Sequence, residues 1–323
     1  MAVNTNTVET FDVTTIREDL QDALISISPF DRPMMSAIGT KNVSNTLFEW
    51  PVTQLAAVNS SNRVAEGEAA PANDAATLPV RQQNVIQISD KTVEISTTAE
   101  IVNGAANAQT MSEQIALKLR ELGRDMESML CGNTAANLGS SGTARATAGL
   151  PAFLRTNVSA GTGGADGTTS GSGTSGYVNA ARTDGTLRII TEAMLNDVVK
   201  QCWDSGADPS LALVGSAIKQ KISSTFTGNS TRYKEADDKR LVGAVDILTT
   251  DFGEITVVPS RLSRGRDVLV LDPSYARVCY LQETKQTDLA VTGHATRKLI
   301  SCHYGLQVDT EDAHGIVADV KAA

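Results

Sequence analysis

The sequence predicts an α+β fold in which two interleaved lobes carry an N-terminal arm and a long extended hairpin. Three observations support this prediction. Apolar residues alternate on either side of a polar tip at residues 56–79, recur at helical spacing over residues 110–131, and form short helices and strands in alternation over residues 191–271. With 323 residues, 41% of them hydrophobic, the chain is long enough for about two domains.

The composition argues against several classes of protein. No stretch approaches the roughly 20 apolar residues that span a bilayer, and residues 1–20 lack the basic start and apolar block of a signal peptide. The net charge of −9 argues against a dedicated nucleic-acid reader, which needs a basic surface. The four cysteines form no CxxC pair, so we expect reduced thiols in a cytosolic compartment.

Motifs for catalysis and for metal or nucleotide binding are missing from the sequence. The three histidines form no HExxH or HxH pattern, and neither GxxxxGK[ST] nor GxSxG occurs. The GxGxxG match at residues 171–176 lies in a low-complexity stretch without a preceding strand or a following helix. Acidic pairs such as Glu66 and Glu68 are interpreted as solvated loop charge. We therefore predict a protein that is not an enzyme, without a metal or a cofactor.

The first 40 residues are predicted to form an N-terminal arm. Ile16, Leu20, Leu24 and Ile27 recur at helical spacing, and prolines at positions 29 and 33 end this pattern. A helix of three turns buries little apolar surface by itself. We therefore expect the arm to lie on another surface.

The extended hairpin is predicted over residues 41–106. Residues 47–52 form its outgoing strand, and the return strand over residues 80–96 places Ile86 and Ile88, then Val93 and Ile95, at period two. Such a hairpin has almost no core of its own and must lie on something else. This requirement is the first indication of an assembly protein.

Residues 110–131 are predicted to form the longest helix. Thr110 and Glu113 have the spacing of a capping box, and Gly132 supplies the stop. The apolar face consists of Ile115, Leu119, Leu122, Met126 and Met129. The opposite face, interpreted as solvated or inter-subunit, consists of Lys118, Arg120, Glu121, Arg124, Asp125 and Glu127.

The rest of the chain is predicted to form a compact α/β lobe followed by returning strands. The glycine-rich segment 159–176, with seven glycines in eighteen residues, is expected to be a mobile loop. Helices at 191–204 and from Ser216 to about residue 226 alternate with strands at 211–214, 245–250, 254–259 and 268–271. Further strands are expected at 297–304, 306–310 and 314–320, with Gly305 marking a turn.

Several short segments carry a resemblance to a known family. They are residues 48–50 (FEW), 59–67 near the hairpin tip, 93–96 (VEIS), 145–150, 304–308 (YGLQV) and 314–315. Their order along nearly the whole chain resembles the major capsid proteins of tailed bacteriophages, which have the Hong Kong 97 fold. More narrowly, it resembles the SU-ten type of major head protein. The glycine-rich segment looks like an insertion.

The resemblance implies a division of the chain into named parts. These are the N-terminal arm (1–40), the extended loop (41–106), a peripheral P domain with the spine helix (107–185), an axial A domain (186–284) and returning P-domain strands (285–323). Contacts between subunits are expected at Phe48, Trp50, Arg63, Glu66, Glu68, Arg120 and Arg124.

The resemblance also implies a function and partners. Copies of the chain would form hexamers and pentamers of an icosahedral head that encloses double-stranded DNA without sequence-specific binding. The shell would assemble in the bacterial cytoplasm and become part of the virion, with a portal, a separate scaffolding protein and a cement protein as candidate partners. Some members are crosslinked through a lysine near the loop tip. Here no lysine lies between Lys41 and Lys91, so a shell without crosslinks is expected.

Three other interpretations stay open at this point. The same fold would suit an encapsulin-like nanocompartment, which would hold an enzyme cargo instead of DNA. A cytosolic α/β enzyme with scattered catalytic groups belongs to a different class, and a tail or baseplate protein is a third possibility. Electron microscopy separates these three interpretations. A nanocompartment protein forms shells, an enzyme forms isolated oligomers, and a tail protein forms tubes.

Overall fold

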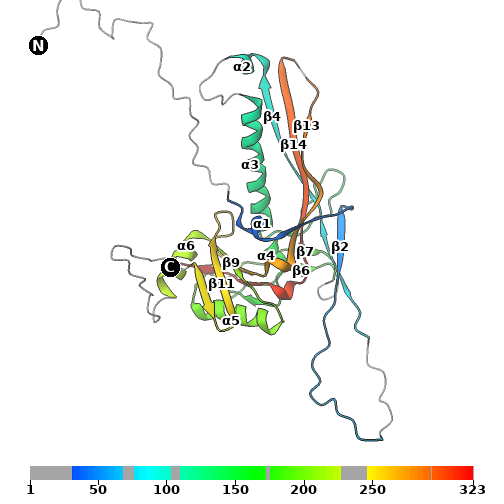
Figure 1. Ribbon diagram of the computed structural model, residues 1–323, viewed down its shortest axis with the longest axis vertical. Helices are drawn as coiled ribbons and strands as arrows, with labels where there is room; N and C mark the ends of the chain where they lie inside the picture. The colour runs from blue at the N-terminus through cyan, green and yellow to red at the C-terminus, as the bar shows by residue number, and fades with distance from the viewer. Residues whose placement is uncertain are drawn as a thin grey trace, which may run out of the picture.

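The computed structural model describes residues 31–67, 76–102, 110–171, 175–226, 246–291 and 293–322. A long helix and a narrow sheet stand at one end of the molecule, a compact α/β lobe lies at their base, and the hairpin projects in the opposite direction (Figure 1). The helices are α1 (Pro33–Ala37), α2 (Thr97–Ile101), α3 (Met111–Leu130), α4 (Leu150–Phe153), α5 (Glu192–Asp204) and α6 (Ser216–Thr225), with 3-10 turns at Pro273–Tyr275 and Glu311–Ala313. The helix predicted at residues 16–27 lies outside the described residues.

The peripheral sheet has the strand order β1-β13-β14-β4. Its strands are β1 (Gly39–Asn42), β13 (Ala276–Asp288), β14 (Ala295–Val308) and β4 (Gln87–Ser96). The strands are antiparallel except for β1, which runs parallel to β13. The predicted turn at Gly305 is wrong, because β14 continues through this residue. A Cβ atom at Gly305 would lie 2.8 Å from the Phe48 ring, so close packing explains the glycine.

The hairpin begins as predicted, with β2 (Leu47–Val52) paired antiparallel to β3 (Val80–Val85). The return limb then leaves its partner, because β4 pairs with β14 in the peripheral sheet. Where β3 ends and β4 begins, the consecutive residues Val85 and Ile86 are both buried, so the alternation of buried and exposed side chains shifts by one residue. Ile88 therefore faces outward with half of its surface exposed, whereas it was predicted to share the face of Ile86.

The spine helix α3 has the predicted position, but its burial differs from the prediction. Thr110 is the N-cap residue without a side-chain cap hydrogen bond, so the capping box is not formed. Leu122 and Met126 in the second half of α3 are buried, whereas Leu119 in the first half is 42% exposed. Glu127, assigned to the charged face, is fully buried because its carboxylate accepts hydrogen bonds from the first turn of α1.

The axial lobe contains the predicted helices and strands around a second sheet of order β10-β11-β9-β12-β15-β5. The strands are β10 (Ile247–Thr250), β11 (Gly253–Pro259), β9 (Leu211–Val214), β12 (Val268–Leu271), β15 (Gly315–Val317) and β5 (Val158–Ser159). Three strands differ from the predicted domain limits. Strand β13, which begins within the predicted axial residues 186–284, belongs to the peripheral sheet. Strands β5 and β15, which fall within the predicted peripheral residues 107–185 and 285–323, belong to the axial sheet. The sheet that each strand joins is decided by pairing with strands far away in the sequence, and the local hydrophobic pattern does not indicate these partners.

The described parts of the glycine-rich segment, residues 159–171 and 175–176, pack against the fold, in contrast to the mobile loop that was expected; residues 172–174 lie outside the described residues. It contains β6 (Thr168–Thr169), which pairs with β7 (Val178–Ala180), and it ends beside β3 at Gly176. A Cβ at Gly161 would lie 2.2 Å from the Thr186 carbonyl oxygen, and one at Gly167 would lie 2.6 Å from the Ala152 oxygen. These glycines therefore permit close backbone packing.

Two hydrophobic cores hold these parts together. One lies between α3, α4, the base of the hairpin and the peripheral sheet, and the other fills the axial lobe between α5, α6 and the second sheet. The short pair of β8 (Arg188–Ile189) and β16 (Val320–Lys321) closes the lobe near the C-terminus. In the described parts of the chain, no helix is both long and apolar enough to cross a membrane.

Candidate assembly interface

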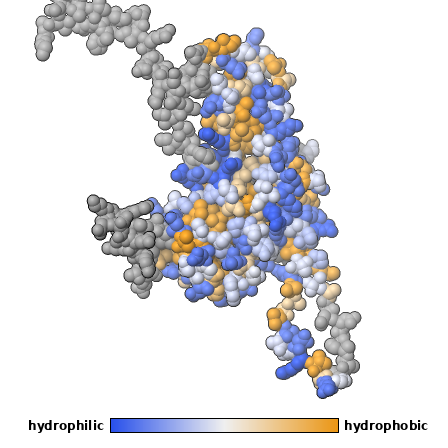
Figure 2. All heavy atoms as spheres, in the orientation of Figure 1, coloured by the Kyte–Doolittle hydropathy of each residue, from blue (hydrophilic) through white to orange (hydrophobic). Residues whose placement is uncertain are grey.

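The distal part of the hairpin exposes apolar side chains that have no cover within the described chain. Leu55 and Val58 are each 96% exposed, Leu78 is 77% exposed and Val64 is 60% exposed. Hydrophobic and hydrophilic residues are interspersed along the coloured part of the projecting hairpin, away from the body of the molecule (Figure 2). A partner that covered them would remove apolar surface from water at several points along the hairpin.

Phe48 and Trp50, two of the predicted contact residues, lie in the chain's own core. They are 6% and 5% exposed, and their rings stack with centroids 5.7 Å apart. The Trp50 ring also lies 6.5 Å from that of Phe153 on α4. Alternation along β2 turns both rings inward. These aromatic side chains therefore attach the hairpin to the body and leave little surface for another subunit.

Three predicted contact residues belong to the hairpin tip. Arg63 and Glu66 are exposed, and neither forms an ion pair with another described residue. Glu68 lies outside the described residues. A tip with a solvated cation and a solvated anion suits the polar rim of an interface.

Arg120 and Arg124, the remaining two, lie on α3. Arg120 is exposed, whereas Arg124 is half-buried. Helix α3 and the hairpin point to opposite ends of the molecule (Figure 1). The six predicted residues that the structure describes therefore lie in three separate places: the hairpin base, the hairpin tip and the spine helix.

A groove of about 550 Å³ lies where the hairpin leaves the body. Residues 52–55 line one side, and Thr156, Tyr275 and Asp312 are among those lining the other. The Gln54 amide donates to Asp312 Oδ2, and the Thr156 hydroxyl donates to Asp312 Oδ1 at 2.9 Å. These hydrogen bonds connect the outgoing limb to the body at the hinge of the hairpin.

The neighbouring Glu311 is a buried acid that no sequence motif singles out. Its Oε2 accepts a hydrogen bond from the Arg155 amide at 2.7 Å, and the Arg155 guanidinium lies 3.9 Å from Oε1. Burial raises the pKa of Glu311 to about 7, although Arg155 opposes this shift. The carboxyl group closes the turn before β15, and it faces the body rather than the groove.

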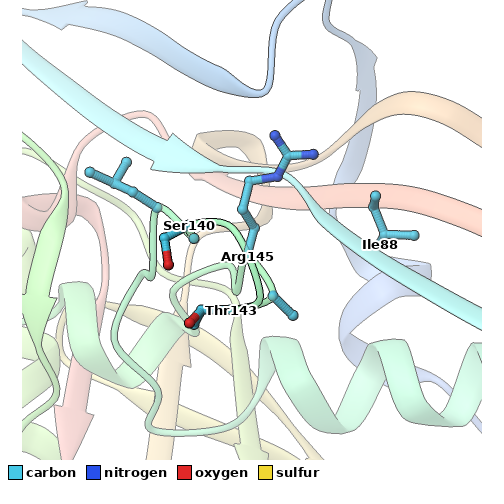
Figure 3. A pocket seen from close by; sticks show the side chains of 7 residues that line it. Ile88, Ser140, Thr143 and Arg145 are labelled. Carbon is cyan, nitrogen blue, oxygen red and sulfur yellow. The ribbon is translucent and has the colours of Figure 1, made fainter.

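A second surface hollow, of about 400 Å³, lies between β4 and the turn at residues 137–146. Ile88 and Leu138 give it apolar walls, and the Arg145 guanidinium points away from the hydroxyls of Ser140 and Thr143 (Figure 3). These side chains do not form a pair of nucleophile and base.

The described side chains also do not form a metal centre. No group of three His, Cys, Asp or Glu residues within these parts of the chain could hold a metal ion. All four cysteines are buried free thiols, and burial raises the pKa of Cys202 to about 12 and that of Cys279 to about 11. Such thiols are unreactive near neutral pH.

Solved structures with this arrangement define a class of shell-forming proteins. The chain is similar to the capsid of cyanophage A-1(L), with a TM-score of 0.68 and 14% identity over 97% of this chain and 99% of that one. It is similar to a protein of Mycobacterium phage Bobi, with a TM-score of 0.61 and 13% identity over 98% of each chain. The chain is also similar to an encapsulin of Synechococcus elongatus, with a TM-score of 0.54 and 13% identity over 95% of this chain and 94% of that one. The predicted Hong Kong 97 fold is thereby confirmed.

The sequence then assigns the family within that class. The family model of the SU10 major capsid protein matches residues 3–321, so the chain belongs to this family. The major capsid protein of Escherichia phage Phieco32 is 25% identical over 264 residues, which are 80% of this chain. The aligned part spans 65% of that relative's length. The resemblance to tailed-phage major capsid proteins is thereby confirmed.

Two residues that organise the structure escaped the sequence analysis. Glu127 was assigned to a solvated or inter-subunit face because it stands among other charges on α3. Asp319 is 1% exposed at φ 58°, and its carboxylate accepts hydrogen bonds from the amides of Gly161 and Gly185. No motif near either residue indicates these contacts, because their partners are more than 90 residues away in the sequence.

Proposed function

We propose that this chain is the shell subunit of a tailed-bacteriophage head and that it assembles as hexamers and pentamers around double-stranded DNA. The observation that carries this proposal is the hairpin, whose distal apolar side chains are exposed while its base is fixed in the body. In the assembled shell, a neighbouring copy covers the distal limbs. Family membership supports the role, and an acidic wall limits adhesion to the packaged phosphates.

Energetics favour coverage by another copy. A two-stranded hairpin is only marginally stable in water unless it packs against other structure. Burying one Val or Leu side chain contributes about 1.5–3 kcal/mol, and Leu55, Val58, Val64 and Leu78 are largely exposed. Because each subunit offers the same limbs to a neighbour, a closed shell repeats this gain at every subunit.

The predicted contact residues have different roles in this proposal. Arg63, Glu66 and Glu68 at the tip, and Arg120 and Arg124 on α3, form charged edges of subunit contacts. Phe48 and Trp50 instead hold the base of the hairpin in a fixed direction. The domain limits stated above describe the subunit, with β13 assigned to the peripheral part and β15 to the axial part. A portal, a separate scaffolding protein and a cement protein are the expected partners, and assembly takes place in the bacterial cytoplasm.

The experiment that tests this proposal places charges on the exposed limb. Leu55→Asp combined with Val58→Asp removes the apolar contacts, so we expect shell yield to fall by more than about tenfold. The melting temperature of the unassembled subunit stays unchanged, because both side chains are exposed. Negative-stain microscopy and sedimentation of the expressed protein measure the yield.

The matched control is Ala56→Asp combined with Ser60→Asp, which adds the same charge to the same limb. This variant is expected to assemble. Wild-type shell yield from the Leu55/Val58 variant would contradict the role of the limbs, and a wild-type protein that forms only tubes or small oligomers would contradict the shell itself.

The encapsulin similarity supports a second candidate, a nanocompartment shell. Nucleic acid extracted from purified native particles separates the two candidates. Genome-length double-stranded DNA supports the phage head, whereas particles with an enzyme cargo and without DNA support the compartment.

A further inference from the structure

One face of α3 is covered over its second half and open over its first. Ala116, Leu119, Gly123 and Glu127 follow at three- and four-residue steps, so they share this face. Gly123 and Glu127 are buried, whereas Ala116 is half-buried and Leu119 is 42% exposed. The apolar stripe therefore continues beyond the point at which its cover ends.

The cover over the second half is the beginning of the described chain. Helix α1 lies beside the lower part of α3 (Figure 1), and the Glu127 carboxylate accepts hydrogen bonds from the amides of Met34 at 2.8 Å and Met35 at 2.9 Å. The Arg32 guanidinium lies against Gly123, where a Cβ would be 2.7 Å from Nη1. The residues that precede Arg32 therefore start at the boundary between the covered and the open face.

The length of the preceding segment matches the open face. From Gly123 back to Met111, α3 rises about 18 Å. Residues 16–27, if helical, also extend about 18 Å, and residues 28–31 provide the connection. Pro29 and Pro33 keep this connection from continuing the helix.

The chemistry of the segment matches as well. Ile16, Leu20, Leu24 and Ile27 form one apolar stripe, which complements Leu119 and the small side chain of Ala116. The segment carries Arg17 and three acids (Glu18, Asp19 and Asp22), which gives it a net charge of −2. Arg120 lies beside the stripe in the open half of α3 and Arg124 follows Gly123, so both arginines attract the acids of the segment, whereas Glu113 lies on the same side near the start of α3.

We propose that residues 16–27 dock as an amphipathic helix on the open face of α3 in the same chain, parallel to α3 and between Met111 and Gly123. The short helix α1, fixed by Glu127, directs the segment onto this face. The docking is a property of the single subunit, so it stands independently of the proposed shell function.

Hydrogen exchange on the full-length protein, before assembly, tests the docking. Leu20→Asp combined with Leu24→Asp places charges on the docked stripe and uncovers α3. Amides in residues 111–121 are then expected to exchange about tenfold faster than in the wild type. Gln21→Asp combined with Ser26→Asp adds the same charge to other faces of the segment and is expected to leave the exchange unchanged. Equal exchange in wild type and in the Leu20/Leu24 variant overturns the proposal.

A cysteine pair identifies which copy supplies the segment. The four native cysteines are buried, so Leu24→Cys and Leu119→Cys add the reactive thiols. Under mild oxidation we expect a disulfide within one chain, visible as a faster monomer band on a non-reducing denaturing gel. Leu24→Cys paired with Leu187→Cys in the axial lobe is the control and is expected to stay reduced. A crosslinked dimer from the Leu24/Leu119 pair, or no crosslink, overturns docking within the chain.

Discussion

Gly305 shows how a single residue can have a structural reason that its sequence context conceals. It lies within β14 opposite Cys279, and the Phe48 ring occupies the space that a side chain would need. The Phe48 ring is in turn buried at the base of the hairpin. The glycine therefore determines how closely the hairpin approaches the peripheral sheet.

Replacing Gly305 with alanine is expected to destabilise the subunit by about 1–3 kcal/mol, because the new methyl group meets the Phe48 ring and the Val85 carbonyl oxygen. Urea unfolding followed by tryptophan fluorescence measures the change, since Trp50 lies in the same contact. Gly265→Ala is the control, because a Cβ at Gly265 meets nothing within 4 Å. Equal losses in the two variants would show that the close approach is not the cause.

Two buried titratable residues near the start of β15 give opposite contributions to the pH dependence of stability. Glu311 binds a proton more tightly in the folded state, because burial raises its pKa to about 7. Its contribution therefore falls as the pH rises from its ordinary pKa toward 7. Burial lowers the pKa of His314 to about 4, so its contribution rises with pH over about 4–6.5.

Comparing the wild type with Glu311→Gln isolates the acid, since His314 is present in both. Between pH 4.5 and 7 the free energy of unfolding of the wild type is expected to fall by about 3 kcal/mol relative to the variant. Arg155 and Asp312 are the charged groups facing Glu311, and both remain in the variant. Denaturant titrations across this pH range measure the difference. Parallel curves would mean that Glu311 ionises in the folded protein at its ordinary pKa.

At the scale of elements, the start of the glycine-rich segment is bound by a residue from the far end of the chain. Asp319 Oδ1 accepts hydrogen bonds from the Gly185 amide at 2.9 Å and the Arg266 guanidinium at 2.6 Å, and Oδ2 accepts from the Gly161 amide at 3.1 Å. Burial by itself raises the pKa of Asp319, but these hydrogen bonds outweigh it and lower the pKa. One carboxylate thus joins the segment, the axial lobe and the C-terminal residues.

Asp319→Asn is expected to lower the free energy of unfolding by about 1–3 kcal/mol, because one acceptor and the ion pair with Arg266 are lost. Asparagine tolerates the positive φ, so backbone strain is not added. Limited proteolysis is expected to cleave faster within residues 160–186. The control is Asp309→Asn, which removes a more exposed ion pair with Arg277 and is expected to cost less than about 1 kcal/mol. Unchanged proteolysis in Asp319→Asn would show that other contacts hold the segment.

At the scale of the whole molecule, the body buries its apolar side chains, whereas the distal hairpin exposes them. The body contains two cores and buries the aromatic residues of the hairpin base. The distal limbs add exposed apolar surface that only a partner removes. The two cores lie within a single chain, and coverage of the limbs by other copies is expected to add further stability.

Mature particles are expected to be held by non-covalent contacts, because residues 42–90 contain no lysine to form a crosslink. After boiling in denaturant, purified particles should give a single subunit band on a gel. A ladder of covalent multimers would contradict this prediction.

Patterns within short windows were sufficient for much of the fold. The hairpin strands, α3, α5, α6 and β9–β12 follow from local periodicity, and their predicted bounds are close to the observed ones. The order of short motifs also pointed to the correct family. Local patterns did not identify the partner of Phe48 and Trp50. Alternation places both rings on one side of β2 but does not tell whether the chain's own core or another subunit covers that side.

The sequence by itself determined the longer helices, most of the longer strands, their order and the family, because periodicity and turn residues act over a few positions. The tertiary structure decided the roles of Gly305, Glu127 and Asp319 and the sheet to which β13 and β15 belong. Each of these depends on a contact between residues that are far apart in the chain. Such contacts are set by packing and by the pairing of buried polar groups, and neither leaves a local pattern.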